Sequence, residues 1–360
     1  MSIEQFPEGE ELEELNIHVL EKIVLNLREL AKKVSLSLPS REELRKRLNI
    51  RKIVHKPYIT RLKAYYIDGS YSEPALELLG GCLAVYAVGY VSSSGEMSIE
   101  YGGATIVDDQ REISRLVTAL EHKLAIKLLE DKRHGIRDFD IIVHDGPINS
   151  FPGEPFTAAR KYVDLIRREL ELAEKTNTII VGIPKVTRAT YAAALLSLVP
   201  EIDKVPPVIP DRALATYVLE RGEYAVLGKL RDVLPTYAEY LKRYRKKKVP
   251  DDPLELVKEV PQYGDIVLVL MRTASGLRVE IYDPTGELVD DVVSYIYWET
   301  GQGSSVYPYL HDRVDQLVRV RLQDTLWAYT VLLENIKDPD TVLGLLALAN
   351  PQKAYLYRRR

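Results

Sequence analysis

Apolar residues recur at spacings of three and four near the start of the chain. This spacing predicts an amphipathic helix or a helical hairpin within residues 10–50. A second, charged helix is predicted over SREELRKRLN, where Ser40 is a suitable N-cap and Glu43 has capping-box spacing. The apolar positions of the first helix are Leu15, Val19, Leu20, Ile23, Val24 and Leu27.

The pattern changes to strand-like runs between Leu62 and Ile106. Three such runs follow one another, LKAYYID, GCLAVYAVGYV and MSIEYGGATIV, with SSSGE as a turn between the last two. They predict an antiparallel meander. Residues 111–131 and 157–175 then indicate helices, each followed by an apolar strand, FDIIVHD and NTIIVGIP. Such alternation is typical of parallel pairing in an α/β sheet.

The remainder of the chain is less regular. Residues 186–262 are rich in proline, and we interpret them as a partly helical insertion. Two strands, GDIVLVLMR and GLRVEIYD, come next, followed by VVSYIYWE and a long helix after Pro308. We therefore expect an N-terminal helical segment (1–58), a main domain (59–335) that contains the insertion, and a C-terminal extension (336–360).

Three strands, a helix, a strand, a helix and a strand is the element order of the ribonuclease H-like fold. In that fold the first strand is central and lies between the second and the fourth. We therefore expect an α/β protein with a mixed sheet flanked by helices. The ends of strands one and four would then be neighbours, and those ends carry Asp68 and Asp145.

Composition excludes several classes of protein. The chain has 360 residues, 46% of them hydrophobic, and a net charge of only −4, so bulk charge indicates neither nucleic-acid nor membrane binding. The longest apolar stretch, residues 80–91, is too short to span a membrane, and the acidic N-terminus is unlike a signal peptide. We expect a cytoplasmic protein. The single cysteine, Cys82, excludes a disulfide framework and a cysteine zinc cluster.

Three carboxylates occupy positions that suggest a metal site. Asp68 and Asp145 each end a strand and precede a glycine, which lets the backbone turn and leaves the carboxylate at the edge of the sheet. On a helical wheel with Ile113 at zero, Glu121 falls near 80°, on the buried flank of its helix. A carboxylate there is unfavourable unless it is paired or bound to a metal.

The last long helix offers further ligands. With Leu310 at zero, His311 falls near 100° and Asp315 near 140°, so both can face the sheet. Oxygen ligands without cysteine suit Mg²⁺ or Mn²⁺ better than zinc. Two such ions about 4 Å apart activate water and stabilise the leaving oxygen in phosphodiester hydrolysis. The pattern therefore favours a metal-dependent nuclease.

Other catalytic motifs do not fit the sequence. A haloacid-dehalogenase phosphatase needs a second aspartate two residues after the first, and that position is Ser70. The Asp-Gly-Ser turn differs from the Asp-x-Gly of actin-like ATPases. The sequence also has no P-loop, no His-Glu-x-x-His motif and no Gly-x-Gly-x-x-Gly motif.

Five motifs in order resemble those of the NurA nuclease family of archaea and some bacteria. They are YYIDGSYS, ALEHKLA, IIVHDGPI, IIVGIPKVTRA and VYPYLHDRVDQ, and they lie between residues 60 and 322. The resemblance implies a ribonuclease H-like, manganese-dependent 5′-to-3′ exonuclease that also cuts single-stranded DNA. It also implies a homodimer that resects DNA ends in double-strand break repair with the hexameric HerA translocase.

The resemblance also suggests residue roles. Asp68, Glu121 and Asp145 match the metal-binding acids of the family, and Lys185 matches a lysine that can contact phosphate. With Tyr307, Lys185 would orient the phosphate and the water. The segment YPYLHDRVD departs from the commoner family pattern, because Asp315 stands where many members have histidine. The fourth ligand is therefore open between Asp315 and His311.

Several residues are candidates for binding DNA. The run YLKRYRKKKV is strongly basic and contains an aromatic residue, so it can follow a DNA backbone, although a solvated helix end has the same pattern. Trp298 flanks a glycine-rich segment and can stack on a base, or it can simply pack in the core. The full set is Lys185, Arg188, Trp298, Tyr309, Lys242, Arg243 and Arg245.

Two alternatives to a DNA nuclease remain. One is a catalytically silent ribonuclease H-like module that binds nucleic acid or serves as a scaffold for a motor protein. The other is a nuclease that acts on RNA with the same acids. The intact carboxylates argue against the first. We expect His144, next to Asp145, to point to the opposite face of the sheet and to have a structural role.

Overall fold

The computed structural model describes most of the chain between residues 39 and 336. The described ranges are 39–73, 76–78, 81–108, 110–148, 156–185, 189–197, 209–245 and 252–336. The first predicted helix, Arg188 and almost all of the predicted C-terminal extension lie outside them. Ser40 accepts a hydrogen bond from the Glu43 backbone N–H at 3.2 Å and caps helix α2 (Arg41–Arg47), as predicted.

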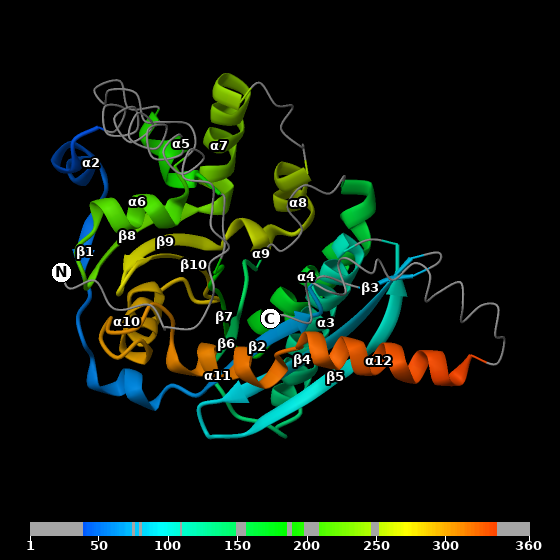
Figure 1. Ribbon diagram of the computed structural model, residues 1–360. Coiled ribbons are helices and arrows are strands. Elements are labelled where there is room, and N and C mark those ends of the chain that lie inside the picture. The colour runs from blue at the N-terminus through cyan, green and yellow to red at the C-terminus, as the bar shows by residue number, and fades with distance from the viewer. Residues whose placement is uncertain are drawn as a thin grey trace, which may run out of the picture.

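Within the described residues, the strands form one mixed sheet (Figure 1). The strands are β1 (Ile50–Lys52), β2 (Ala64–Tyr71), β3 (Leu76–Leu78), β4 (Gly81–Ser92), β5 (Met97–Val107), β6 (Ile141–His144), β7 (Ile179–Gly182), β8 (Glu223–Lys229), β9 (Val267–Arg272) and β10 (Gly276–Tyr282). Their order is β1-β8-β9-β10-β7-β6-β2-β4-β3, and β5 pairs with β4. Only β2–β6 and β6–β7 are parallel. The mixed α/β fold is thus as predicted, with β2 between β4 and β6.

Helices cover both faces of the sheet. Helices α3 (Gln110–Arg133) and α4 (Phe156–Lys175) contribute to the core on one face. The 3₁₀ helix η1 (Pro57–Arg61), α10 (Val289–Glu299) and α11 (Tyr309–Val318) contribute to the core on the other. The remaining helices are α5 (Tyr191–Ser197), α6 (Asp211–Val218), α7 (Leu230–Arg245), α8 (Asp252–Glu259), α9 (Pro261–Gly264) and α12 (Leu322–Asn335).

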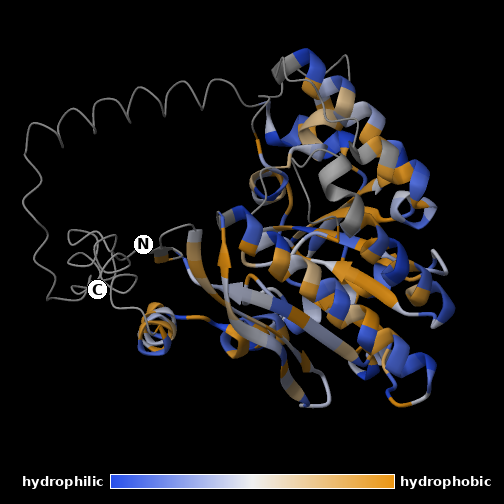
Figure 2. Ribbon diagram, turned by 90° about the vertical axis from the view of Figure 1, so that its right-hand side faces the viewer, coloured by the Kyte–Doolittle hydropathy of each residue, from blue (hydrophilic) through white to orange (hydrophobic). Residues whose placement is uncertain are grey.

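Strand β2 shows how the sequence divides the two cores. Tyr65 and Ile67 belong to the core that contains α3, while Ala64 and Tyr66 belong to the core that contains α11. This is the alternation expected of a strand that is buried on both faces. The helices carry hydrophobic and hydrophilic residues along their length, in keeping with one buried face and one exposed face (Figure 2).

Two parts of the architecture differ from the sequence-based expectation. Strand β8 lies in the segment interpreted as an insertion and pairs with β9 and β1, so that segment contributes to the main sheet. Strand β1 likewise joins the sheet from the segment expected to be helical. The domain boundaries themselves stay a prediction. No helix in the described part of the chain is long and apolar enough to cross a membrane.

The helix predicted after Pro308 is two helices, α11 and α12. Arg319 and Arg321 have extended backbone angles, and the Val320 N–H donates to Ser70 Oγ at 3.2 Å. That N–H is therefore bonded to β2 instead of to a carbonyl of the preceding turn. The segment VVSYIYWE is helical and forms most of α10.

Candidate active site

Asp68 and Asp145 are side by side because β2 and β6 are parallel. Ile67 pairs with His144, and the Asp145 N–H donates to the Ile67 carbonyl at 3.0 Å. Asp68 is 5% exposed, and the Asp145 side chain is 8% exposed. Two carboxylates are thus held close together at the end of the strand pair, as the predicted strand order requires.

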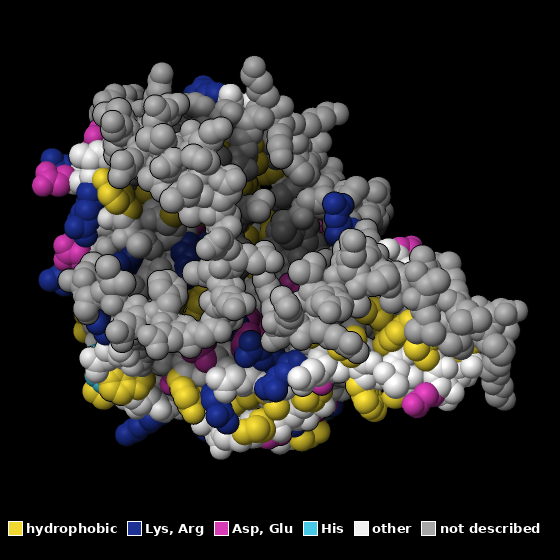
Figure 3. Space-filling model, viewed as in Figure 1, with side chains coloured by type: hydrophobic (Ala, Val, Ile, Leu, Met, Phe, Trp, Pro, Cys, Tyr) yellow, Lys and Arg dark blue, Asp and Glu magenta, His cyan; other side chains and the backbone are white. Residues whose placement is uncertain are grey.

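Helix α11 adds a third carboxylate. Asp68, Asp145 and Asp315 each offer an oxygen atom, and these atoms lie within 4.8 Å of one another. The Asp315 side chain is half exposed, so this side of the cluster faces solvent. In Figure 3, acidic and basic side chains lie next to one another near the middle of the viewed face, around the position of α11 in Figure 1.

Glu121 reaches the cluster from α3, on the other face of the sheet. Its side chain is 9% exposed. A Cβ atom at Gly69 would lie 2.7 Å from Glu121 Oε1 and 2.4 Å from Val117 Cγ1. Glu121 therefore extends into space that any other residue at position 69 would fill. The Gly69 N–H donates to Asp68 Oδ1 at 2.7 Å.

Lys185, just after β7, supplies positive charge to the cluster. Its Nζ lies 2.5 Å from Asp145 Oδ2 and 2.8 Å from Asp315 Oδ1. The Lys185 side chain is 27% exposed. Although burial would lower the pKa of Lys185, Asp145 and Asp315 raise it above its usual value. Lys185 is therefore a cation held between two of the acids.

The acids differ in their protonation behaviour. Burial and the neighbouring Asp145 raise the pKa of Asp68 to about 8. Burial, Asp68 and Asp145 raise the pKa of Glu121 well above its usual range. Burial also opposes ionisation of Asp145, but His311 and Lys185 outweigh it and lower the pKa of that carboxyl. The pKa values of Asp68 and Glu121 are raised although Lys185 is nearby. Ionisation of all the acids at neutral pH therefore requires further positive charge.

His311 and Tyr307 lie next to Asp145. His311 is fully buried, and its Nε2 is 3.2 Å from Asp145 Oδ1 without the alignment of a hydrogen bond. The rings of His311 and Tyr307 are stacked, with centroids 5.3 Å apart. His311 therefore contacts Asp145 from the side opposite to Lys185, which binds the other carboxylate oxygen.

Arg212 is a neighbour of the site that the sequence reasoning missed. Its Nη1 donates to the Tyr307 hydroxyl at 2.9 Å and to the Lys185 carbonyl at 2.8 Å. The Tyr307 hydroxyl in turn donates to the same carbonyl at 3.3 Å. Arg212 lies in the first turn of α6, inside the segment treated as an insertion. The only sequence signal was its place after Pro210 and Asp211, at a helix start.

The predicted DNA-binding residues are dispersed. The Trp298 ring stacks on His55, with centroids 4.5 Å apart. Tyr309 is 62% exposed at the start of α11. Lys242 and Arg243 are exposed near the end of α7, where Arg243 lies 3.6 Å from Glu239. Arg245 is in α7, but its side chain and the whole of Arg188 lie outside the described part of the chain.

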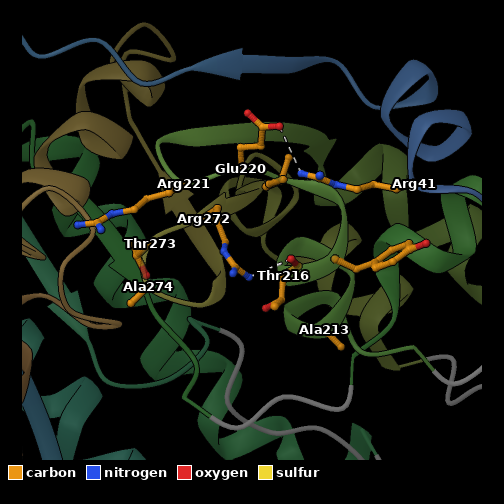
Figure 4. Close-up of a pocket in the computed structure, with 10 residues that line it drawn as sticks. Arg41, Ala213, Thr216, Glu220, Arg221, Arg272, Thr273 and Ala274 are labelled. Carbon is orange, nitrogen blue, oxygen red and sulfur yellow. Dashed lines mark hydrogen bonds and ion pairs between the residues drawn. The ribbon is translucent and has the colours of Figure 1, made fainter. Parts of the chain in front are cut away.

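A pocket of about 840 Å³ lies elsewhere, beside the second half of α6 (Figure 4). Three arginines line it, but each donates to a protein carbonyl: Arg41 to Val218, Arg221 to Gln302 and Arg272 to Thr216. None of the acids described above lines this pocket. The chemistry therefore belongs to the acid cluster and not to this pocket.

Comparisons with known proteins match this chain to one domain family and to solved structures. The NurA domain family matches residues 63–320. The crystal structure of the NurA nuclease from Sulfolobus solfataricus is similar with a TM-score of 0.53 and 15% identity, over 90% of this chain and 99% of that one. Another NurA crystal structure has a TM-score of 0.50 and 12% identity, over 91% and 100%. One of NurA bound to dAMP and manganese has a TM-score of 0.49 and 12% identity, over 92% and 99%. No curated protein matches the sequence.

Proposed function

Because the chain belongs to the NurA nuclease family, we propose that it is a divalent-metal-dependent DNA nuclease with its active site at Asp68, Glu121, Asp145 and Asp315. The observation that carries the proposal is the cluster of four acids from separate parts of the fold, of which Asp68, Glu121 and the side chain of Asp145 are buried. Such a cluster is electrostatically unfavourable alone, and divalent cations would make it favourable.

The donor set fits a hard cation. Asp68, Asp145 and Asp315 present only oxygen atoms, which suit Mn²⁺ or Mg²⁺. Glu121 would complete the ligands from the other face of the sheet. Asp315, whose oxygen atom belongs to the cluster, is favoured as the fourth ligand, while His311 would hold Asp145 in place. We propose two bound ions, which would supply an activated water and stabilise the leaving oxygen.

Lys185 would change partners during the reaction. In the structure its ammonium group neutralises Asp145 and Asp315. Ions bound to these acids would weaken that attraction, and Lys185 would then be free to bind a non-bridging oxygen of the scissile phosphate. Tyr307, which Arg212 holds against the Lys185 carbonyl, would orient the phosphate and the water.

The biological setting is proposed from the family alone. We propose 5′-to-3′ exonuclease and single-strand endonuclease activity on DNA ends, in end resection and homologous recombination. We also propose a homodimer that acts with a HerA-type hexameric ATPase. The exposed Tyr309, Lys242 and Arg243 would then contact DNA outside the acid cluster.

Digestion of end-labelled single-stranded DNA, double-stranded DNA and RNA, with Mn²⁺, Mg²⁺ or EDTA, tests this function. Cleavage of DNA with Mn²⁺ is expected from the wild type and not from Asp68→Asn. Asp138→Asn is a matched control, because the Asp138 side chain is 79% exposed and pairs with Lys63, away from the acid cluster. Activity that survives both EDTA and Asp68→Asn would exclude the metal site. Cleavage of RNA alone would change the substrate, and an inert wild type would favour the scaffold alternative.

A further inference from the structure

A second cluster of titratable groups lies where helices α3 and α4 meet the end of β6, on the face of the sheet opposite to Asp145. Glu169 of α4 is 1% exposed and bridges two buried histidines. Its Oε2 is 2.5 Å from His122 Nδ1, and its Oε1 is 2.7 Å from His144 Nε2. His122 belongs to α3, and His144 is the last residue of β6. The His144 side chain lies on the face opposite to Asp145, as predicted from strand alternation.

The distances identify this cluster as a hydrogen-bonded bridge. Each carboxylate oxygen of Glu169 accepts from a different imidazole at hydrogen-bond length. Burial would raise the pKa of Glu169, but His144 and His122 lower it to about 2, so the carboxylate is ionised. An ionised acceptor makes both bonds strong and directional. The bridge thus ties α4 to α3 and to β6 at the same point.

The two histidines are direct neighbours of two acids of the site. His122 follows Glu121 in α3, and His144 precedes Asp145 at the end of β6. Adjacent residues share a peptide plane, so fixing one side chain limits the backbone movement of the next. Apolar residues of α3 and of the sheet share one core, and such contacts are not directional, whereas the two hydrogen bonds of Glu169 link α3 to β6 with a defined geometry.

We propose that Glu169, through His122 and His144, is a positioning residue that sets the separation of Glu121 and Asp145 and thereby the geometry of the metal site. The inference rests on the proposed function, because it gives these acids a metal to hold. Residues that orient metal ligands from outside the ligand shell commonly change metal affinity or activity by 10–100-fold when they are replaced.

Two substitutions separate geometry from charge. Glu169→Gln removes the charge but keeps one acceptor and one donor, and a neutral histidine can supply the matching group by changing tautomer. Glu169→Leu has a similar size but makes no hydrogen bond. We expect Glu169→Leu to raise the Mn²⁺ dissociation constant about tenfold and to lower kcat, with the KM for DNA close to wild type. Glu169→Gln should retain most of the Mn²⁺ affinity and most of kcat.

The Mn²⁺ dissociation constant is measured from the electron paramagnetic resonance signal of free Mn²⁺, which does not depend on catalysis. Glu223→Gln is a matched control. Glu223 lies on β8, four strands from β6, and is buried and paired with Arg45 of α2. The substitution should lower the melting temperature and leave Mn²⁺ affinity unchanged. Should Glu169→Leu not fold, His144→Phe removes one donor while keeping a ring, and the same loss of affinity is expected.

The outcomes test the nuclease function and the positioning role of Glu169 separately. Wild type that binds Mn²⁺ but cleaves no DNA would overturn the proposed function and leave the positioning inference to be judged by the dissociation constants. Wild-type Mn²⁺ affinity in Glu169→Leu or His144→Phe would overturn the positioning role. A wild type that does not bind Mn²⁺ would also overturn the positioning role. The same holds if the wild type binds one equivalent of zinc that Glu169→Leu does not bind, because the cluster of His122, His144 and Glu169 would then be a metal site itself.

Discussion

At the scale of single residues, Gly69 decides whether Glu121 can reach the other acids. Its lack of a side chain leaves room for a carboxylate that comes from the opposite face of the sheet. The Asp-Gly pair was visible in the sequence and predicted a turn. The structure gives the glycine a steric role instead, within β2 and next to α3.

Gly69→Ala should therefore reduce nuclease activity by about 10–100-fold, the range typical for the loss of a group that positions a metal ligand. The added methyl group would displace Glu121 or Val117, and Mn²⁺ affinity should fall in parallel. Gly102→Ala in β5 is the control, because its Cβ would meet atoms no closer than 3.7 Å. Equal Mn²⁺ affinity in Gly69→Ala and Gly102→Ala would show that the space at Gly69 is not needed for metal binding.

Lys185→Met should affect metal binding and catalysis in opposite directions. Because Lys185 competes with cations for Asp145 and Asp315, its loss should tighten Mn²⁺ binding. The loss of a cation at the phosphate should lower kcat by about 100-fold. Titration calorimetry and steady-state kinetics measure the two effects, with Lys63→Met, an exposed ion-pair residue, as control. Weaker Mn²⁺ binding in Lys185→Met would contradict this account.

At the scale of elements, part of the site was predictable and part was not. Long apolar runs and strand-end aspartates placed β2 and β6 side by side, and the helical wheel placed Glu121 on a buried flank. Glu169 could have been found by the same test, since it lies about 40° from the buried Ala173 on α4. Arg212, strand β8 and the break between α11 and α12 depend on tertiary contacts that no local pattern encodes.

Helix α6 reaches the site through one arginine, and Arg212→Lys tests its role. A lysine keeps the charge but cannot donate to the Tyr307 hydroxyl and the Lys185 carbonyl from one planar group. We expect kcat to fall about tenfold with Mn²⁺ affinity unchanged, because Arg212 touches no acid of the cluster in the described contacts. Arg272→Lys, also paired with a carbonyl near α6, is the control. Unchanged kcat in Arg212→Lys would remove α6 from the mechanism.

The turn between β4 and β5 has a pH-dependent anchor. Glu96 accepts hydrogen bonds from Arg137, Tyr90 and Tyr65. Arg137 first, and then the two tyrosines, lower the pKa of Glu96 to about 2 against the effect of burial. The stabilisation is therefore complete above the unfolded-state pKa of about 4.3 and is lost as the pH falls towards 2.

Glu96→Gln should lower the melting temperature at pH 7 and have a diminishing effect below pH 4. The side chain is 42% exposed, so solvent screening limits the loss at pH 7 to about 1 kcal/mol. Thermal unfolding of both proteins between pH 2.5 and 7 measures the difference. A difference that stays constant over this range would show that the charge of Glu96 does not stabilise the turn.

At the scale of the whole molecule, metal binding should be linked to stability. The buried acids oppose folding when they are ionised, and bound cations remove that penalty. Mn²⁺ at 100 times its dissociation constant should stabilise the wild type by about 2.7 kcal/mol. Asp68→Asn should show a much smaller rise in melting temperature with Mn²⁺. Equal rises in both proteins would place the binding of the ion elsewhere.

The acid cluster also draws on nearly the whole length of the described chain. Asp68 comes from β2, and Asp315, 247 positions later, comes from α11, one of the last described elements. Contacts between such distant positions require the closure of a long loop, which costs conformational entropy and slows folding. A growing polypeptide on the ribosome thus carries Asp68 and Asp145 long before α11 is made. If cleavage needs Asp315, as proposed above, the chain would become active only after that helix is synthesised, and the nascent chain would be harmless to nucleic acids around it.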